Sequence, residues 1–301
     1  MSKIQVAKVR NFEGHRSAIY TLGKSRRPGH FLSAGSEGIL VEWNIESGDG
    51  LALAKADAAI YSLASLPEYK LLILGLSTGV IAFVDSTQNK IIKTVQAHKK
   101  GVFDFQVFPD RPHALASGED GSLTVWDLEK LELLHKQQIS SKSIRTMAFH
   151  PHKEEILLGA SDNHIRVLDY GLGEQNKWEA HRFSVFRLDF SLSNGDLLSV
   201  GRDAHLAAWQ TEKNYHNRVH IPAHLYAIND ICQHPEGKLL FTGSMDKSIK
   251  VWDSASYKLL KVVDFQRDQC HINGINRLLW VGDSLFSCGD DRLIMQWRLK
   301  T

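Results

Sequence analysis

A tryptophan recurs along the chain at a nearly constant interval, and this interval constrains the fold more than any other feature. Five tryptophans each end a short apolar run, and two further runs end in an aliphatic residue. The run ends are Trp43, Val84, Trp126, Leu168, Trp209, Trp252 and Trp297, spaced 41 to 45 residues apart. Such a period is typical of proteins built by repeating one supersecondary unit. We therefore expect seven units of about 43 residues.

Each unit follows the same internal order. A small residue and a histidine, as in Ala223-His224, precede a short apolar strand, a turn and a second strand. A tight turn such as Ser117-Gly-Glu-Asp120 leads into the third strand, and a less regular fourth strand follows. Asp, Gly and Asn suit tight turns because they tolerate left-handed or hydrogen-bonded backbone. Four short strands per unit without helical periodicity predict an all-β repeat protein.

The period, the small residue before His, the Ser/Thr-Gly-x-x-Asp turn and the terminal Trp-Asp resemble the WD40 repeat family across essentially all 301 residues. The resemblance implies an all-β fold, one seven-bladed β-propeller of four-stranded antiparallel blades. The expected domain is 1–301, with repeat units of approximately 13–53, 54–95, 96–138, 139–178, 179–221, 222–264 and 265–301, and with 1–12 as the outer strand of the last blade.

The last unit has three strands, and the strand-like segment Ile4–Phe12 precedes the first unit. We expect this segment to pair into the last blade, since an unpaired strand edge invites aggregation. The N-terminal strand would then close the propeller.

The resemblance implies a hydrogen-bonded set of His, Ser/Thr, Asp and Trp in each complete blade, which satisfies buried polar groups. We interpret these sets as structural tetrads rather than catalytic triads, because they recur from blade to blade. The complete tetrads are His181, Ser199, Asp203, Trp209; His224, Thr242, Asp246, Trp252; and His271, Ser287, Asp291, Trp297.

Other units depart from this pattern. Blade 1 carries Glu37 at the Asp position, and blade 3 carries Ala116 at the Ser position. Blade 4 has Ser141 for the His and Leu168 for the Trp, while blade 2 lacks both residues and carries Thr78 at the Asp position. We expect apolar packing to hold blades 2 and 4.

In the family, the face bearing the His loops and Asp turns is the one most used for protein recognition. Carried over position by position, this face holds aromatic and arginine side chains, which are enriched in interface hot spots. The alternative is that the rings fold inward over the channel mouth. The predicted protein-binding residues are Tyr20, Tyr61, Phe103, Glu119, Arg145, Phe186, Arg202, Asn229, Met245, Asn276 and Asp290.

The function that follows is a non-catalytic scaffold that binds a peptide or protein partner on this face, without catalytic residues, cofactor or metal. One alternative is a reader of modified peptides or nucleic acid. The alternative ranked last is a channel-centred propeller enzyme, which a cluster of Asp104, Asp189 and Asp230 around one cavity would favour. We interpret His150 and His152 as turn residues, because the surrounding spacing is not that of a zinc site.

Charge and cysteine content bear on partners and compartment. The formal charge of +2 gives no general reason to expect nucleic acid or an anionic membrane as a partner. The chain has neither a signal-peptide core nor an apolar run of membrane-spanning length. Cys232, Cys270 and Cys288 are odd in number and lack a Cys-x-x-Cys pair, so we expect reduced thiols and a cytoplasmic location. We expect the protein to be monomeric by itself.

Overall fold

The computed structural model describes residues 4–300. Its strands form seven antiparallel sheets of four strands each. Six sheets pair four consecutive strands in sequence order. In the seventh, the order is β1-β28-β27-β26, so its outer strand comes from the N-terminal segment. The predicted fold class, an all-β seven-bladed propeller of four-stranded antiparallel blades, is confirmed.

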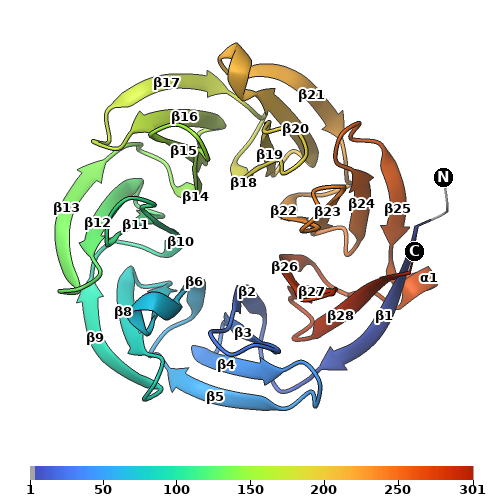
Figure 1. Ribbon diagram of the computed structural model, residues 1–301, viewed down its shortest axis with the longest axis horizontal. Helices are drawn as coiled ribbons and strands as arrows, with labels where there is room; N and C mark the ends of the chain where they lie inside the picture. Colours follow the sequence, from blue (N-terminus) through green and yellow to red (C-terminus); the bar gives the residue numbers. More distant parts are fainter. Residues whose placement is uncertain (1–3, 301) are drawn as a thin grey trace. The chain divides into compact units, whose positions relative to one another are not determined.

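The chain divides into two compact units, which are described separately: a four-blade unit, Tyr20–Glu179, and a three-blade unit made of Met1–Ile19 and Ala180–Thr301. In the four-blade unit the first strand of each sheet lies on the inner side and the fourth on the outer side (Figure 1). Blades 1 to 4 are β2 (Ile19–Lys24), β3 (His30–Gly35), β4 (Ile39–Asn44), β5 (Gly50–Lys55); β6 (Ile60–Leu66), β7 (Leu71–Leu76), β8 (Val80–Asp85), β9 (Lys90–Gln96); β10 (Val102–Val107), β11 (His113–Gly118), β12 (Ser122–Asp127), β13 (Glu132–Gln138); and β14 (Ile144–Phe149), β15 (Glu155–Ala160), β16 (His164–Asp169), β17 (Glu174–Glu179).

The three-blade unit contains blades 5 to 7. Its strands are β18 (Val185–Phe190), β19 (Leu197–Gly201), β20 (His205–Gln210), β21 (His216–Pro222); β22 (Ile228–Gln233), β23 (Leu239–Ser244), β24 (Ile249–Asp253), β25 (Leu259–Val263); and β26 (Ile275–Val281), β27 (Ser284–Gly289), β28 (Ile294–Lys300) with β1 (Gln5–Phe12). Three short helical turns complete the chain: η1 (Pro67–Tyr69), η2 (Thr211–Lys213) and α1 (Phe265–Asp268). Among the described residues, no helix is long and apolar enough to span a bilayer.

The tight turns follow from local backbone geometry. Gly121 closes the turn before β12 with φ of +78°, and a Cβ atom there would lie 2.0 Å from the carbonyl oxygen of Ser140. Only glycine fits this position, because both the left-handed backbone and the close approach exclude a side chain. The turn thereby holds the inner strands of blade 3 in register.

The hydrophobic core lies between neighbouring blades of each unit. In the four-blade unit, Phe83 of blade 2 packs on Trp126 of blade 3, with ring centroids 5.6 Å apart. In the three-blade unit, Phe241 of blade 6 stacks on Trp280 of blade 7 at 5.7 Å. Within a unit, a sheet that lies between two others packs one face against the preceding blade and the other face against the following blade, which explains why both of its faces are apolar.

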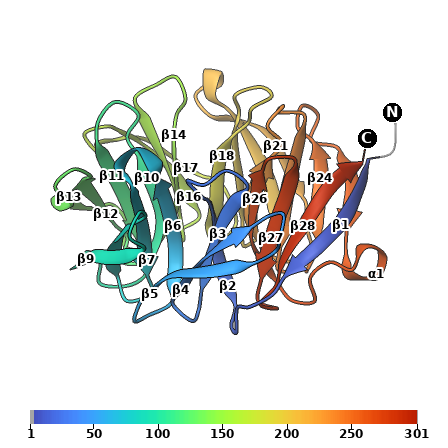
Figure 2. The ribbon, with the colours of Figure 1, turned by 60° about the horizontal axis from the view of Figure 1, so that its bottom comes forward.

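The closing strand lies where the sequence predicts. β1 runs alongside β28 (Figure 2) and pairs with it from Gln5 opposite Lys300 to Phe12 opposite Ile294. Phe12 is buried, and its ring lies 5.9 Å from that of Phe286. The predicted pairing of the N-terminal strand is confirmed, although the first three residues of the predicted segment 1–12 lie outside the described residues.

Candidate functional site

The His, Ser/Thr, Asp and Trp side chains of blades 5 to 7 lie within hydrogen-bond distance of one another. In blade 5, His181 Nδ1 lies 2.9 Å from Asp203 Oδ1 and its Nε2 lies 2.8 Å from Ser199 Oγ. Trp209 Nε1 donates to the same Oγ at 2.9 Å. Equivalent contacts join the members of the other two sets, which are His224, Thr242, Asp246, Trp252 and His271, Ser287, Asp291, Trp297.

The contacts assign one direction to every hydrogen bond of a tetrad. A carboxylate only accepts, so His181 Nδ1 donates to Asp203; the neutral ring then accepts at Nε2 from Ser199. Burial by itself raises the pKa of Asp203, but the hydrogen bonds that it accepts from His181 and from the N–H groups of Arg182 and His205 lower it to about 2. Burial lowers the pKa of His224, only partly opposed by Asp246. We therefore assign an ionised Asp246 and a neutral His224 to the tetrad of blade 6.

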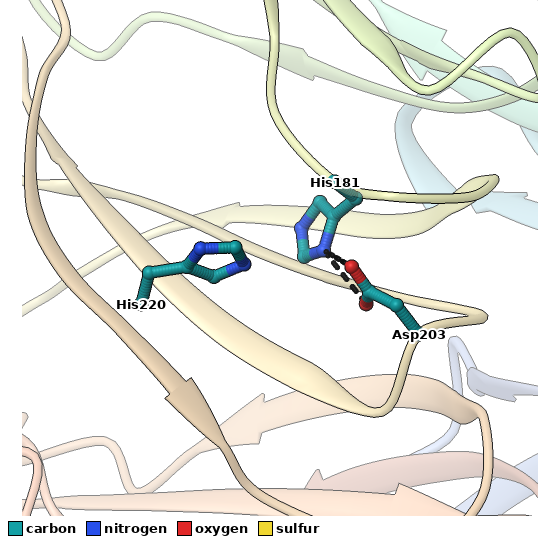
Figure 3. A group of neighbouring side chains, drawn as sticks. All are labelled: His181, Asp203 and His220. Atoms are coloured by element: carbon teal, nitrogen blue, oxygen red, sulfur yellow. Dashed lines mark hydrogen bonds and ion pairs between the residues drawn. The ribbon is translucent and has the colours of Figure 1, made fainter.

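Blade 5 carries additional imidazoles beside its tetrad. His181, Asp203 and His220 each offer a possible metal ligand, and these atoms lie within 4.8 Å of one another. Figure 3 shows His220 approaching His181 from the side opposite Asp203. However, both nitrogens of His181 already engage Asp203 and Ser199. Only Asp203 and His220 then have lone pairs to offer to a metal, which is fewer than a metal site needs. The hydrogen bonds of the tetrad therefore explain why these side chains lie close together better than a metal site does.

Blade 3 completes its set with a residue that the sequence reasoning missed. Ala116 stands at the expected Ser position, but Thr124 on β12 supplies the hydroxyl instead. Its Oγ1 accepts from Trp126 Nε1 at 2.9 Å and lies 3.1 Å from His98 Nε2. His98 Nδ1 lies 3.0 Å from Asp120 Oδ1. The signal was a hydroxyl two residues before the Trp, at a position where the other tetrads carry none.

Blade 4 corrects the register chosen from sequence. Ser140, not Ser141, donates to Asp162 at 3.1 Å, because the separation of 22 residues to the Asp is kept. Arg166 also forms an ion pair with Asp162, through two guanidinium nitrogens. Blade 4 therefore adds a charged pair to the apolar packing predicted for it, whereas β7 of blade 2 is buried and apolar throughout.

The inner-strand aspartates connect neighbouring blades. Asp104 accepts the backbone N–H of Met147, 2.8 Å away in blade 4. In the same way Asp230 accepts the N–H of Leu278 in blade 7 at 2.8 Å. Asp189 accepts from the side-chain amide of Gln233 in blade 6, and burial raises its pKa. These carboxylates are used as acceptors between strands, which gives the channel-enzyme alternative no support from their arrangement.

The predicted face residues of the four-blade unit form one continuous series. Tyr20 meets Tyr61 edge-on at 5.5 Å, and Tyr61 stacks on Phe103 at 5.8 Å with an interplanar angle of 18°. The Arg145 guanidinium lies 5.0 Å from the centre of the Phe103 ring and donates to Ser161 at 2.8 Å. All four side chains are half-buried. We call Tyr20, Tyr61, Phe103 and Arg145 the aromatic ladder.

Glu119 borders the ladder. Burial raises the pKa of Tyr61, and the neighbouring Tyr20 and the negative charge of Glu119 raise it further. The Tyr61 hydroxyl is thus held in its neutral form, which can both donate and accept a hydrogen bond.

The predicted face residues of the three-blade unit are mostly polar. Asn276 donates to the Ile19 carbonyl at 3.0 Å and to Asp290 at 2.7 Å, while Asn229 donates to the Ile275 carbonyl. Two of the predicted residues thus bridge neighbouring strands. Phe186 is half-buried, and Arg202, Met245 and Asp290 are exposed.

A second group of residues in this unit was missed from sequence. Within two residues after each tetrad histidine of this unit lies a large, exposed apolar side chain; these are Phe183, Leu225, Tyr226 and Ile272. They lie between the histidine and the first strand, before the loop positions that were chosen from sequence.

Comparisons with known proteins agree with this architecture. The family model described as "WD domain, G-beta repeat" matches residues 89–127 and 216–253. WD repeat-containing protein 90 of Xenopus tropicalis is 25% identical over 233 residues, covering 72% of this chain and 12% of that protein. Protein groucho of Drosophila melanogaster is 25% identical over 201 residues, covering 67% and 27%. Transcription factor unc-37 of Caenorhabditis elegans is 28% identical over 161 residues, covering 54% and 26%.

The chain thus spans only 12% to 27% of the length of these curated relatives. The similarity to these relatives is limited to the repeat region. In the described residues the repeat units form seven four-stranded sheets, one for each unit. Two segments of the chain match the WD40 repeat model, and the chain is similar to WD repeat proteins.

Proposed function

We propose that this propeller is a non-catalytic scaffold that binds a protein or peptide partner on the face bearing the His loops and Asp turns. The observation that carries the proposal is the aromatic ladder. Its rings are in contact with one another, and each ring is only partly buried, so that part of its surface is accessible to a ligand. Aromatic and arginine side chains are the residues that contribute most to protein interfaces.

The ladder favours a ligand with an apolar group and an acidic group. Stacked rings offer flat apolar area, and Arg145 provides a guanidinium at one end of the series. A cationic modified side chain is disfavoured at this end, because Arg145 already covers Phe103. For this reason we rank a protein or peptide partner above the modified-peptide reader.

The similarity to WD repeat proteins supports the same proposal. The relatives include a protein named as a transcription factor, unc-37, of which this chain spans 26%. For the present chain we propose only the general role of a protein-binding platform, with a partner defined by the chemistry of the face.

The remaining parts of the proposal concern the whole domain. We propose that 1–301 is one propeller domain divided into the repeat units given above, and that the protein is monomeric by itself. Cys232, Cys270 and Cys288 are free thiols, and burial raises the pKa of all three. Neutral thiols, fully buried at Cys270 and Cys288 and partly buried at Cys232, fit the reducing cytoplasm that we propose as its location.

The test is a double substitution in the ladder. Tyr61→Ala with Phe103→Ala removes its central stack, and affinity purification with mass spectrometry then compares the co-purifying proteins with those of the wild type. A matched control is Leu133→Ala with Leu134→Ala, two exposed leucines on the outer strand β13. We expect about tenfold lower partner recovery for the ladder variant alone, with unchanged circular dichroism. Equal recovery from all three proteins would contradict the proposal.

A further inference from the structure

The three-blade unit exposes an apolar surface on its His loops and on one Asp turn. Five large side chains there are 48% to 84% exposed, although the described part of the chain buries most of its residues of this kind. We call them the apolar loop patch: Phe183, Leu225, Tyr226, Met245 and Ile272. Exposed apolar clusters of this kind usually mark interaction sites.

The patch has a regular origin in the repeat. Phe183 stands two residues after the tetrad His of blade 5, Leu225 and Tyr226 follow that of blade 6, and Ile272 follows that of blade 7. Equivalent loops on adjoining blades of one unit lie at the same edge, and contacts between β18 and β22 and between β22 and β26 place these blades side by side. The exposed side chains of these loops therefore lie at the same edge of the unit.

The tetrads hold the backbone of these loops rigid. The N–H of Leu225 donates to Asp246 at 3.1 Å, and the N–H of Ile272 donates to Asp291 at 3.2 Å. Ser244 Oγ donates to the Tyr226 carbonyl at 3.1 Å. Apolar side chains on a fixed backbone lose little further freedom when a partner binds, which favours affinity.

Met245 connects two parts of the patch. It stands before the turn Asp of blade 6, and its Cα lies 3.5 Å from where a Cβ of Gly274 in blade 7 would be. The absence of a side chain at Gly274 leaves Met245 adjacent to the loop that carries Ile272. Methionine adapts its shape to different apolar ligands, as is common at protein-binding surfaces.

The exposed charges around the patch are mostly positive. The guanidinium carbons of Arg182 and Arg202 lie 5.5 and 5.9 Å from the Phe183 ring centre. Lys247 and Arg292, which directly follow the turn aspartates of blades 6 and 7, are also exposed. The tetrad aspartates use their oxygens on His and backbone N–H groups, and exposed Asp290 accepts from Asn276. A partner that complements these four cations carries acidic groups.

We infer that the apolar loop patch binds a short peptide segment in which bulky apolar residues alternate with Asp or Glu. This inference rests on the proposed function and specifies which blades and which peptide chemistry serve it. The apolar side chains of the segment cover Leu225, Tyr226 and Ile272, and its carboxylates pair with Arg182 and Arg202. A second copy of this chain is the competing occupant.

The experiment selects random short peptides displayed on phage against the immobilised protein. Recovered peptides are then synthesised and their binding is measured by fluorescence anisotropy. We expect enrichment in Trp, Phe, Leu or Ile together with Asp or Glu. Leu225→Ser with Tyr226→Ser should weaken binding by tenfold or more, and Arg182→Gln with Arg202→Gln should weaken it severalfold and reduce its dependence on salt.

Leu192→Ser is the matched control, because Leu192 is 62% exposed in the same unit but lies in the β18–β19 turn, away from the His loops. Equal weakening by this control, or selected peptides without acidic residues, would overturn the inference. Self-association abolished by the Leu225 and Tyr226 changes would assign the patch to a second copy instead, and would also overturn it.

The ladder variant separates this inference from the proposed function. If the selected peptides lose affinity with Tyr61→Ala and Phe103→Ala but not with the Leu225 and Tyr226 changes, the face binds peptides and the assignment to the patch is wrong. If neither pair of changes affects binding, both proposals fail.

Discussion

Replacing Thr124 by valine tests the substituted tetrad of blade 3. The Thr124 hydroxyl accepts from Trp126 Nε1 at 2.9 Å and lies 3.1 Å from His98 Nε2, and all three side chains are buried. Valine keeps the volume but removes the hydroxyl, so the indole N–H and the imidazole nitrogen both lose their partner. A buried polar group without a partner costs about 1–3 kcal/mol, and we expect a total loss of about 2–4 kcal/mol in the free energy of unfolding.

Urea unfolding followed by tryptophan fluorescence measures this loss. The control is Thr94→Val on the outer strand β9, where the threonine is exposed. A surface change of this kind should remain within about 0.5 kcal/mol of the wild type. If Thr124→Val were no more destabilising than Thr94→Val, the hydrogen bonds of blade 3 would contribute nothing measurable, and our interpretation of the tetrad would be refuted.

A second substitution makes the test specific to the hydroxyl. In blades 1, 5, 6 and 7 the hydroxyl that accepts from the Trp stands ten residues before it. Ala116 stands ten residues before Trp126. Ala116→Ser in the Thr124→Val background should therefore restore about 1 kcal/mol or more. In the wild-type background the same change adds a buried hydroxyl that is not needed, so a benefit there as large as in the variant would contradict the argument.

Three further predictions follow from other parts of the fold. Deleting residues 1–11 should lower the melting temperature by several degrees because β28 loses its partner strand, and a change below about 1 °C would disprove the closure. Asp104→Ala should cost about 1–3 kcal/mol in urea unfolding, since the buried N–H of Met147 loses its acceptor. Because burial lowers the pKa of His98 in the folded state, the unfolded chain alone takes up this proton as pH falls below about 6.5, so stability should fall between pH 7 and 5. A melting temperature that is flat or rises over this range would contradict that assignment.

The architecture could be predicted because it depends on a period. The third strands of their blades contain Trp43, Trp126, Trp209, Trp252 and Trp297, as the spacing implies. The first four of these are the next-to-last residue of their strand, whereas β28 continues for three residues beyond Trp297. A strand order repeated seven times leaves few alternative topologies, and the missing fourth strand of the last blade could be assigned to the N-terminal segment. Units with few motif residues, such as blade 2, could be located only from the spacing of the motifs on either side of them.

The polar details could not be predicted in the same way. Ala116 and Ser141 were assigned by counting along one strand, but a hydroxyl can reach the same buried indole from another strand, as Thr124 does. Phe183 and Leu225 lie in loops, where no periodicity indicates whether a side chain is buried or exposed. Asn276, predicted for the face, also donates to the carbonyl of Ile19, a contact that the sequence does not indicate.

In blades 3 and 6 a lysine side chain lies beside the tetrad. Lys136 on β13 places its Nζ 3.5 Å from the turn aspartate Asp120 and donates to the carbonyl of Ala97, which precedes the tetrad His. Lys250 on β24 donates to the corresponding carbonyl in blade 6. A lysine ammonium group thus lies beside the tetrad in both blades, from the fourth strand in blade 3 and from the third strand in blade 6.

Blade 5 has an imidazole at the position of Lys136. His220 lies opposite Ala207, two residues before the Trp, as Lys136 lies opposite Thr124. Burial lowers the pKa of His220, and the neighbouring His181 and His205 lower it further. The position is therefore uncharged at neutral pH, and a proton taken up there approaches two other imidazoles. We therefore expect acid to destabilise the tetrad of blade 5 more than those of blades 3 and 6. Protonation of His220 is opposed by His181 and His205, whereas the lysines beside the tetrads of blades 3 and 6 take up no proton.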